Sequence, residues 1–500
     1  MEFSDRLSQV YLGIDLGAES GRVMAGHWDG RTMRLEEIHR FPNGAITVDG
    51  TLRWDIRRLW SEIERGLTLA ATRFGNRIVS IGVDTWALDY VLLDKAGELI
   101  ELPFNYRDPR TRGLVVEACQ RVGRPEIFAA SGLQFMEINT LYQLMAHQRS
   151  APKSLASADR LLMIPDYLNY RLCGAKAAEF TNATTTQFLH PVSGKWSMDL
   201  LEKLGIPTHF LPEIVAPGSV LGRLSDAVKA ATGLGDIPVI APAAHDTGSA
   251  VVGVPTDRTG RANWAYLSSG TWSLLGVEVP KAILTSRTLE LNLTNEGGVD
   301  GTYRLLKNIM GLWLVQQCKR SFDARGKSLD YPALVQLARE AEPLRSLIDP
   351  DDARFLNPAD MPSAIHDYCR ETHQPIPETE GALIRCALES LALKYRRVLG
   401  WIEEVTGEPV EVIHIVGGGS RNTLLNEFTA TACGRPVVAG PVEATILGNL
   451  MMQVRAQGGV KSLSEIRSAI RRSGDVVEVL PGDSRPWEKA WARFLQLPKS

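Results

Sequence analysis

A charged pair, His245 and Asp246, stands among small residues where an apolar run ending at Ile240 gives way to APAAHDTGSA. Phosphoryl transfer needs a carboxylate within hydrogen-bonding reach of the attacking hydroxyl, and groups that neutralise the phosphates. Asp246 has the position of such a proton acceptor. In a structural alternative, Asp246 caps a helix and His245 is an ordinary neighbour. The segment alone leaves both interpretations open.

Two short glycine turns are typical of phosphate-binding hairpins. In Asp15–Arg22 a carboxylate ends an apolar run, and Gly17 and Gly21 flank the turn into the next strand. Glycine lets backbone N–H groups approach an anion without a Cβ in the way, and successive N–H groups form an anion-binding nest. Asp15 could hold magnesium against phosphates through water. The second turn, Leu267–Ser273, adds hydroxyl groups. Each turn alone is equally compatible with an ordinary hairpin.

A third glycine-rich segment, Gly417–Gly419, follows a buried strand and precedes a helical stretch. Its glycines would let a flat adenine or ribose lie against the backbone. A dinucleotide-binding fingerprint competes with this interpretation, but Asn422 stands where that fingerprint needs its last glycine. Gly326–Ser328 matches the end of a P-loop by chance, because Ser321 replaces the first glycine and no strand precedes it.

Aspartates and an aromatic side chain occur together in Val83–Tyr90, between two predicted strands. Sugar hydroxyls are bound by carboxylates and amides, and an apolar ring can lie along the sugar face. Trp86 in this segment, and Asn308 and Trp313 in the second half, offer that chemistry. The alternative is that the aromatic rings are core residues, and we favour it for Trp313.

The elements that position these residues occur in a similar order in both halves of the chain. The predicted strands are 10–16, 21–28, 33–41, 78–83, 88–93, 263–268, 272–277, 303–307 and 410–416. Asp55 is placed to cap a helix over 56–74, and a longer helix is predicted over 378–405. Glycine, proline and charge cluster at 253–260. We therefore expect two copies of one architecture, in domains 1–254 and 255–500.

The composition excludes some function classes. With 44% hydrophobic and 23% charged residues and a net charge of −3, the 500-residue chain has no basic bias that would favour nucleic acid. We expect no membrane partner and a cytoplasmic protein, because the sequence shows neither a signal peptide nor a long apolar span. The six cysteines have no metal-binding spacing, and pairing of Cys369 with Cys386 stays open.

Taken together, the chain resembles the FGGY carbohydrate kinases over nearly its full length. Any one of the shared segments would be weak, whereas their number and order make the match strong. These segments are DLGAESGRVM, EIHRFPNG, DTWALDYVLLD, YRDPRT, NTLYQL, TNATTTQ, HDTGSAV, YLSSGTWSL, TNEGG, LKNIMGLWL, CRETHQPIP, HIVGGGSRNTLLN and AGPVEATILGN.

The resemblance implies an α/β fold with two actin-like (ribonuclease H-like) domains that flank a nucleotide and sugar cleft. Domain 1–254 would bind the sugar and contribute the first phosphate hairpin, and domain 255–500 would bind ATP. The branch of the family that it most resembles transfers the γ-phosphoryl group of ATP to the 1-hydroxyl of L-rhamnulose, in L-rhamnose breakdown. The implied partners are ATP and a small ketose, with Mg²⁺ as cofactor.

Carried over position by position, the resemblance assigns Asp246 as the proton acceptor and Asp15 as the metal ligand. The implied sugar-binding residues are Trp86, Ala87, His245, Asp246, Thr247 and Asn308. The implied ATP-binding residues are Ala18, Glu19, Ser20, Gly21, Arg22, Thr271, Gln316 and Gly418.

Two residues depart from the family pattern. Ala87 replaces a glycine that touches the sugar in D-T-W-G, so its methyl group could narrow the pocket. Glu19 replaces a serine in the first hairpin, and we expect its side chain to point away from the phosphates, because a carboxylate would repel them. An FGGY kinase for another ketose, such as L-fuculose, therefore stays open. A non-catalytic actin-like regulator that binds nucleotide is a separate alternative, and the intact Asp246 and both hairpins argue against it.

Overall fold

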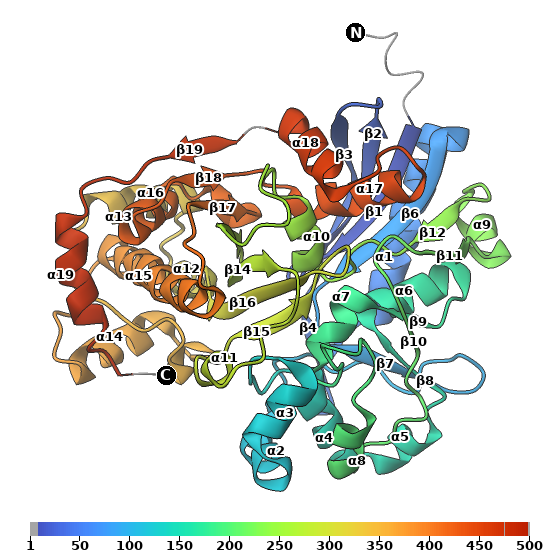
Figure 1. Cartoon of the computed structure of the whole chain (residues 1–500), viewed down its shortest axis with the longest axis horizontal. Coiled ribbons are helices and arrows are strands. Elements are labelled where there is room, and N and C mark those ends of the chain that lie inside the picture. Colours follow the sequence, from blue (N-terminus) through green and yellow to red (C-terminus); the bar gives the residue numbers. More distant parts are fainter. Residues whose placement is uncertain (1–8, 475, 499–500) are drawn as a thin grey trace. The chain divides into compact units, whose positions relative to one another are not determined.

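The computed structural model describes residues 9–474 and 476–498 (Figure 1). The chain divides into two compact units that are not continuous in sequence. Among the described residues, the first comprises 9–259, Val279–Leu305 and Ala444–Gly474, and the second comprises Gly260–Glu278, Leu306–Glu443 and 476–498. A division of function at residues 254 and 255 stays a prediction.

The first unit contains most of the strands. Its strands are β1 (Gln9–Leu16), β2 (Ser20–Trp28), β3 (Met33–Pro42), β4 (Ala45–Val48), β5 (Thr51–Trp54), β6 (Ile78–Thr85), β7 (Tyr90–Leu93), β8 (Arg160–Met163), β9 (Ala177–Glu179), β10 (Glu213–Val215), β11 (Val220–Arg223), β12 (Pro238–Ile240) and β15 (Thr294–Gly297). Its helices are α1 (Ile56–Phe74), α2 (Leu114–Val122), α3 (Arg124–Ser131), α4 (Thr140–Ser150), α5 (Pro152–Ser157), α6 (Ile164–Cys173), α7 (Phe180–Ala183), α8 (Met198–Lys203), α9 (Asp226–Thr232), α10 (Asp246–Val252), α11 (Ser286–Glu290), α17 (Ala444–Ala456) and α18 (Leu463–Ser473).

The second unit is richer in long helices. Its strands are β13 (Trp264–Ser269), β14 (Trp272–Val279), β17 (Val412–Val416), β18 (Val437–Ala439) and β19 (Val477–Val479), and the division between the units falls within β16 (Tyr303–Met310). Its helices are α12 (Trp313–Ala324), α13 (Tyr331–Glu340), α14 (Met361–Glu371), α15 (Glu380–Thr406), α16 (Thr423–Cys433) and α19 (Arg485–Phe494).

The two large sheets repeat one strand pattern. The six-stranded sheet has the order β11-β12-β6-β1-β2-β3, and the seven-stranded sheet has the order β15-β16-β14-β13-β17-β18-β19. In the first, the antiparallel hairpin β1–β2 adjoins the parallel strand β6, and in the second, the hairpin β13–β14 adjoins the parallel strand β17. The predicted duplication of one architecture is therefore present in the strand order.

Alternation along β1 explains how its sheet is covered on both faces. Leu12 and Ile14 pack with Ile63 of α1, whereas Tyr11 packs with Leu450 of α17. Successive side chains of a strand point to opposite faces, so an unbroken apolar strand needs a cover on each side. Asp55 caps α1 as predicted, and its carboxylate accepts a hydrogen bond from the Arg58 N–H at 3.0 Å.

Some elements differ from the sequence-based prediction. The strand expected from residue 88 begins only at Tyr90, because Leu88 has a left-handed φ of 78° that interrupts the extended backbone. The β4–β5 hairpin and the helices between residues 109 and 203 were not predicted. In α4 the residues from Thr140 to His147 are all buried, so this helix shows no alternation of polar and apolar faces.

The structure also bears on possible membrane spans and on the cysteines. Within the described part of the chain, no helix combines the length and the apolar character that a membrane crossing needs. All six cysteines are free thiols. Cys369 and Cys386 are both buried, and a hydrogen bond from the Cys386 thiol lowers the pKa of Cys369.

Small residues allow α10 and α17 to cross at close range. A Cβ at Gly448 would overlap the carbonyl oxygen of Ser249, and one at Gly253 would overlap the backbone of Ala444. The backbone atoms cannot move as a flexible side chain can. Close approach of these helices therefore requires glycine at both positions.

We predict opposite effects for two glycine-to-alanine substitutions in helices. Gly448→Ala should lower the thermal unfolding midpoint, since overpacking typically costs about 1–3 kcal/mol. Gly400→Ala, in α15, should raise it slightly, because a Cβ there meets open space and alanine is the better helix former by about 1 kcal/mol. Differential scanning calorimetry on both variants measures the effect. A stabilising Gly448→Ala would contradict the close crossing.

Candidate active site

Three carboxylates meet at one edge of the sheet in the first unit. Asp15, at the end of β1, is the register partner of Asp84 in the parallel strand β6. Thr85 bridges to His245, and its N–H donates to the Ala244 carbonyl at 3.0 Å. Asp246 then begins α10. The carboxyl ends of parallel strands thus bring together residues far apart in sequence, at the edge where open α/β sheets bind ligands.

The three carboxylates influence one another electrostatically. Burial raises the pKa of Asp84 well above its usual value, and the negative charge of Asp15 raises it further. Burial also raises the pKa of Asp246, again with a contribution from Asp15. The Asn449 amide stabilises Asp84 by donating to its Oδ2 at 2.6 Å. Asp84 Oδ1 is buried and has no hydrogen-bond partner among the described residues.

Arg22 is tied to the carboxylate that we predicted to hold metal. Its Nε and Nη2 atoms donate to Asp15 Oδ2 at 3.0 and 2.7 Å, respectively. The turn between them is closed by the Gly17 N–H, which donates to the Ser20 carbonyl at 2.9 Å. Glu19 in this turn is exposed to solvent. The remaining predicted residues of the hairpin, Ala18, Ser20 and Gly21, occupy the turn and the start of β2.

The side chains of His245, Asp246 and Thr247 lie together as predicted neighbours. Thr247 Oγ1 donates to Asp246 Oδ1 at 3.1 Å, and His245 Nε2 lies 3.4 Å from the same oxygen. Both contacts involve Oδ1. Asp246 makes no capping bond of its own, because the N-cap position of α10 belongs to His245. Two neighbouring side chains thus lie against Asp246 Oδ1, which leaves Oδ2 as the oxygen that can accept a proton.

The sequence analysis missed two charged residues beside His245. Arg304, with 0% exposure, places Nη2 3.1 Å from His245 Nδ1 and 3.2 Å from Glu296 Oε2. Glu296 Oε2 itself lies 3.4 Å from His245 Nδ1. A signal was available in the sequence, since Arg304 is a charge inside the predicted strand 303–307 and Glu296 belongs to TNEGG.

A second buried acid, also missed, fixes the backbone before the base candidate. Glu179 Oε2 accepts hydrogen bonds from the Ala244 N–H at 3.0 Å and from the Thr181 hydroxyl at 2.6 Å. Thr181 Oγ1 in turn accepts from the His245 N–H at 3.2 Å. These bonds hold the segment that leads into Asp246. The TNATTTQ segment carried the only signal in the sequence.

Trp86 is held by a buried carboxylate rather than exposed along a groove. Its indole N–H and that of Trp54 donate to Asp89 Oδ2 at 3.0 and 2.5 Å, and Gln143 donates to Oδ1 at 2.8 Å. The centroids of the two indole rings lie 4.2 Å apart. Trp86 is 5% exposed, whereas the neighbouring Ala87 is half-buried. Burial raises the pKa of Asp89 to about 6.

In the second unit, the β13–β14 hairpin is supported by two other backbone segments. The N–H groups of Leu312 and Trp313 donate to the carbonyls of Gly270 and Thr271 at 3.0 and 3.1 Å. Gly419 packs so closely that a Cβ would overlap the Ser269 hydroxyl. The three-glycine segment and the hairpin therefore lie side by side, as a shared nucleotide site in this unit would require.

The turn glycines themselves are not strained. Neither Gly17 nor Gly270 has a positive φ, and a Cβ at either position would meet no atom closer than 3.5 Å. Conformation alone therefore does not explain glycine there. Of the other predicted residues, Thr271, Gln316 and Asn308 are half-buried and Gly418 is exposed, all in the second unit. Trp313 is a core residue, and its indole donates to the Phe355 carbonyl.

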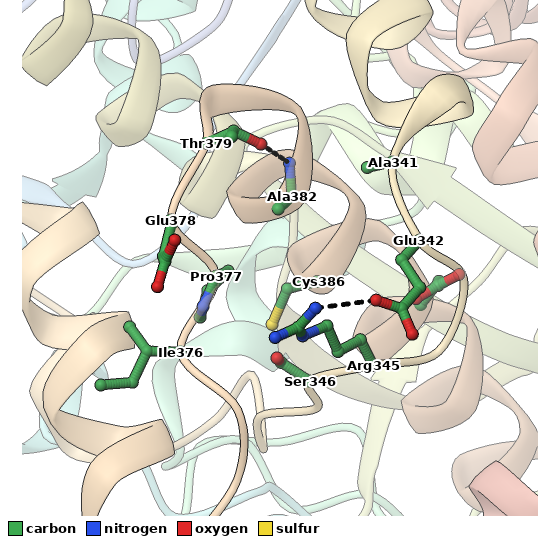
Figure 2. A pocket seen from close by; sticks show the side chains of 11 residues that line it. Ala341, Glu342, Arg345, Ser346, Ile376, Pro377, Glu378, Thr379, Ala382 and Cys386 are labelled. Atoms are coloured by element: carbon green, nitrogen blue, oxygen red, sulfur yellow. Dashed lines mark hydrogen bonds and ion pairs between the residues drawn. The ribbon is translucent and has the colours of Figure 1, made fainter.

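A cavity of about 210 Å³ lies in the second unit beside the start of α15 (Figure 2). None of the predicted sugar or ATP residues lines it. Three of its charged groups are paired: Arg345 bonds to Glu342, and Glu389 accepts from Arg385 and from the Leu344 N–H. The cavity is therefore separate from the predicted site.

Family models match both parts of the chain. The N-terminal domain model of the FGGY family of carbohydrate kinases matches residues 10–253, and the C-terminal domain model matches residues 265–457. The chain belongs to this family. The predicted family and the two-domain α/β fold class are thereby confirmed.

Two similar relatives of this FGGY kinase are rhamnulokinases. The rhamnulokinase of Bacteroides thetaiotaomicron is 46% identical over 98% of this chain and 99% of its own. The rhamnulokinase of Oceanobacillus iheyensis is 42% identical over 94% and 98%, respectively.

Solved structures share the fold at low identity. The ligand-bound xylulose kinase from Lactobacillus acidophilus has a TM-score of 0.80 at 16% identity, covering 98% of this chain and 97% of that one. Plasmodium falciparum glycerol kinase with ADP has a TM-score of 0.75 at 17% identity, covering 99% of each chain.

In this FGGY kinase, Asp89 should make stability depend on pH. An unfolded aspartate titrates near 3.8, whereas the folded pKa is about 6. As the pH rises through this range, the unfolded state loses the proton first, so the free energy of unfolding falls, by about 3 kcal/mol in total once both states are deprotonated. The Asp89→Asn variant has no titrating carboxyl at this position and therefore lacks this pH-dependent loss of stability. Urea unfolding followed by tryptophan fluorescence should show that the wild type loses stability relative to the variant from pH 4 to 6. A pH-independent difference would contradict the assignment.

Proposed function

We propose that the protein is an ATP-dependent rhamnulokinase, which transfers the γ-phosphoryl group of ATP to the 1-hydroxyl of L-rhamnulose. The observation that carries the proposal is the match of 42–46% identity to rhamnulokinases over nearly the whole chain. The carboxylate cluster at the sheet edge supports the reaction class, because it provides a proton acceptor and an oxygen-rich metal environment next to each other.

Asp246 is the proposed general base. Its Oδ2 would accept the proton of the sugar hydroxyl while the hydroxyl oxygen forms a bond to the γ-phosphorus. The bond between that phosphorus and the β,γ-bridging oxygen then breaks, and ADP leaves. The raised pKa of Asp246 makes it a stronger proton acceptor than an exposed aspartate, as general-base catalysis near neutral pH favours.

The first unit has side chains that fit Mg²⁺. Mg²⁺ prefers oxygen ligands and is usually held by one or two carboxylates together with water and substrate phosphates. Asp15 supplies a carboxylate, and the unpartnered Oδ1 of Asp84 points to room for a positive charge beside it. When bound, the ion would neutralise phosphate charge.

The remaining predicted contacts stay predictions. For the sugar they are Trp86, Ala87, His245, Thr247 and Asn308; for ATP they are Ala18, Glu19, Ser20, Gly21, Arg22, Thr271, Gln316 and Gly418. Ala87 supports a second candidate, a kinase for another ketose such as L-fuculose. It is half-buried and stands where the family pattern has glycine, and Leu88 after it has an unusual backbone conformation.

A coupled ADP-release assay tests the function. Purified protein with ATP and magnesium should release ADP fastest with L-rhamnulose in a panel that includes L-fuculose and L-xylulose. Faster turnover of another ketose would favour the second candidate. ATP binding without release of ADP on any ketose would favour a non-catalytic regulator.

Asp246→Asn should lower kcat by about 10²–10⁴-fold, the usual contribution of a general base. The amide keeps the shape of the side chain but cannot accept the hydroxyl proton, so ATP binding should change little. Stopped-flow turnover and calorimetric ATP titration measure the two quantities. Asp226→Asn, at an exposed position, is the control and should keep wild-type turnover. An Asp246→Asn protein with most of its turnover would contradict the base role.

Gly270→Val should fold normally and bind ATP weakly. Its backbone has no positive φ and its surroundings are open, so a loss of affinity would come from crowding of the phosphates. Gly235→Val is a matched control, since that glycine is exposed and also has open surroundings. Calorimetry with a non-hydrolysable ATP analogue should show weaker binding for the first variant alone. Unchanged affinity would contradict a phosphate-binding hairpin.

A further inference from the structure

Arg304 is a fully buried arginine in the first unit, beside the base candidate. Burial of a guanidinium costs several kcal/mol unless it is paired and hydrogen-bonded. Its Nε donates to the Gly297 carbonyl at 2.9 Å, and its Nη2 lies 3.2 Å from Glu296 Oε2. The charge of Arg304 is thus balanced by an acid that is also buried, with 4% exposure.

The same guanidinium nitrogen contacts the imidazole of His245. Arg304 Nη2 lies 3.1 Å from Nδ1, and a guanidinium can only donate hydrogen bonds. Nδ1 must therefore accept, which places the ring proton on Nε2. That nitrogen is the one that lies 3.4 Å from Asp246 Oδ1.

We propose that Glu296 and Arg304 are positioning residues that hold His245 in its Nε2–H tautomer, with this N–H directed at Asp246 Oδ1. Thr247 donates to the same oxygen, so the Thr247 hydroxyl and the His245 Nε2 atom both lie beside Oδ1. The other oxygen, Oδ2, is then kept for the substrate hydroxyl. The role of that hydroxyl rests on the proposed function, whereas the tautomer does not.

The opposite tautomer is disfavoured by the same geometry. A proton on Nδ1 could reach Glu296 Oε2, which lies 3.4 Å away, but it would also face the donor group of Arg304 at 3.1 Å. Two donors cannot share that contact. Nε2 would then carry no hydrogen, and its lone pair would face the lone pairs of Asp246. Glu296 therefore serves to hold the Arg304 guanidinium in place, and the guanidinium determines which nitrogen of the His245 ring carries the proton.

Nitrogen-15 NMR of labelled histidine in the substrate-free protein tests the tautomer directly. Two-bond correlation spectra distinguish the protonated ring nitrogen from the other one, and a His245→Gln sample identifies the signals among the nine histidines. We expect the proton on Nε2 at neutral pH. A proton on Nδ1, or on both nitrogens, would overturn the proposal.

Substitutions at the pair give a second readout. Arg304→Met removes the donor to Nδ1 and leaves Glu296 as an acceptor there, so the proton should move to Nδ1. kcat should fall by about 10- to 100-fold, the loss known for the partners that orient metal-ligating histidines, while KM for ATP stays the same. In the double variant Glu296→Gln/Arg304→Met, the introduced amide can donate to Nδ1, and both the tautomer and most of kcat should return.

The control is Arg467→Met, which removes another fully buried arginine of the first unit, bonded instead to Thr259 and the Val251 carbonyl. It should lower stability without changing the His245 tautomer. If Arg304→Met does not fold, the wild-type spectrum and the double variant still decide. A double variant that folds but keeps the proton on Nδ1 would overturn the proposal.

The proposal about the His245 tautomer and the proposed function can be refuted independently. An Nε2–H tautomer in a protein without ketose-dependent ADP release would refute the proposed function and leave the positioning of Asp246 intact. An active kinase in which Arg304→Met keeps both the tautomer and kcat would refute the positioning role alone.

Discussion

The first unit depends on a constraint set by the parallel strands β1 and β6 of its mixed sheet: three carboxylates must end up near one another at the same edge. The register of β1 and β6 makes neighbours of Asp15 and Asp84, and the bridge from Thr85 to His245 adds Asp246. Like charges at short range in a low-dielectric environment repel strongly. The protein therefore needs donors and positive groups around this edge, and much of the surrounding structure supplies them.

One set of donors comes from the amide side chains of α17. Gln453 donates to the Leu12 carbonyl and to Asn449, and Asn449 donates to Asp84. Gly82 makes this possible, because a Cβ there would lie within 3 Å of both amide side chains. The hydrogen bonds of Asn449 and Gln453 thus form a polar network within the otherwise apolar contact between α17 and the six-stranded sheet. The network fixes where the acids lie while the apolar residues around it supply most of the packing.

Local rules predicted the elements with strong periodicity and the segments that carry chemistry. The cap at Asp55, the two glycine hairpins and the helix over 378–405 follow from patterns within about thirty residues, and the structure contains all of them. The supporting acids could not be found in this way. Glu179 and Glu296 act through contacts with residues 244 and 245, which are 65 and 51 positions away, and no spacing rule connects them. A helix buried on every side, such as α4, likewise lacks the alternation on which prediction depends.

The position of α17 in the sequence also has a consequence for biosynthesis. This helix packs on β1 and β6, yet it begins only at Ala444, more than 350 residues after β6 ends. During translation, the first strands leave the ribosome long before the helix that covers one of their faces. The nascent chain must keep this apolar surface from aggregating until the last tenth of the protein is made, which is a task for chaperones. The edge of the sheet that carries the three carboxylates is therefore completed only late in synthesis, although Asp15, the first of them, is made near the start.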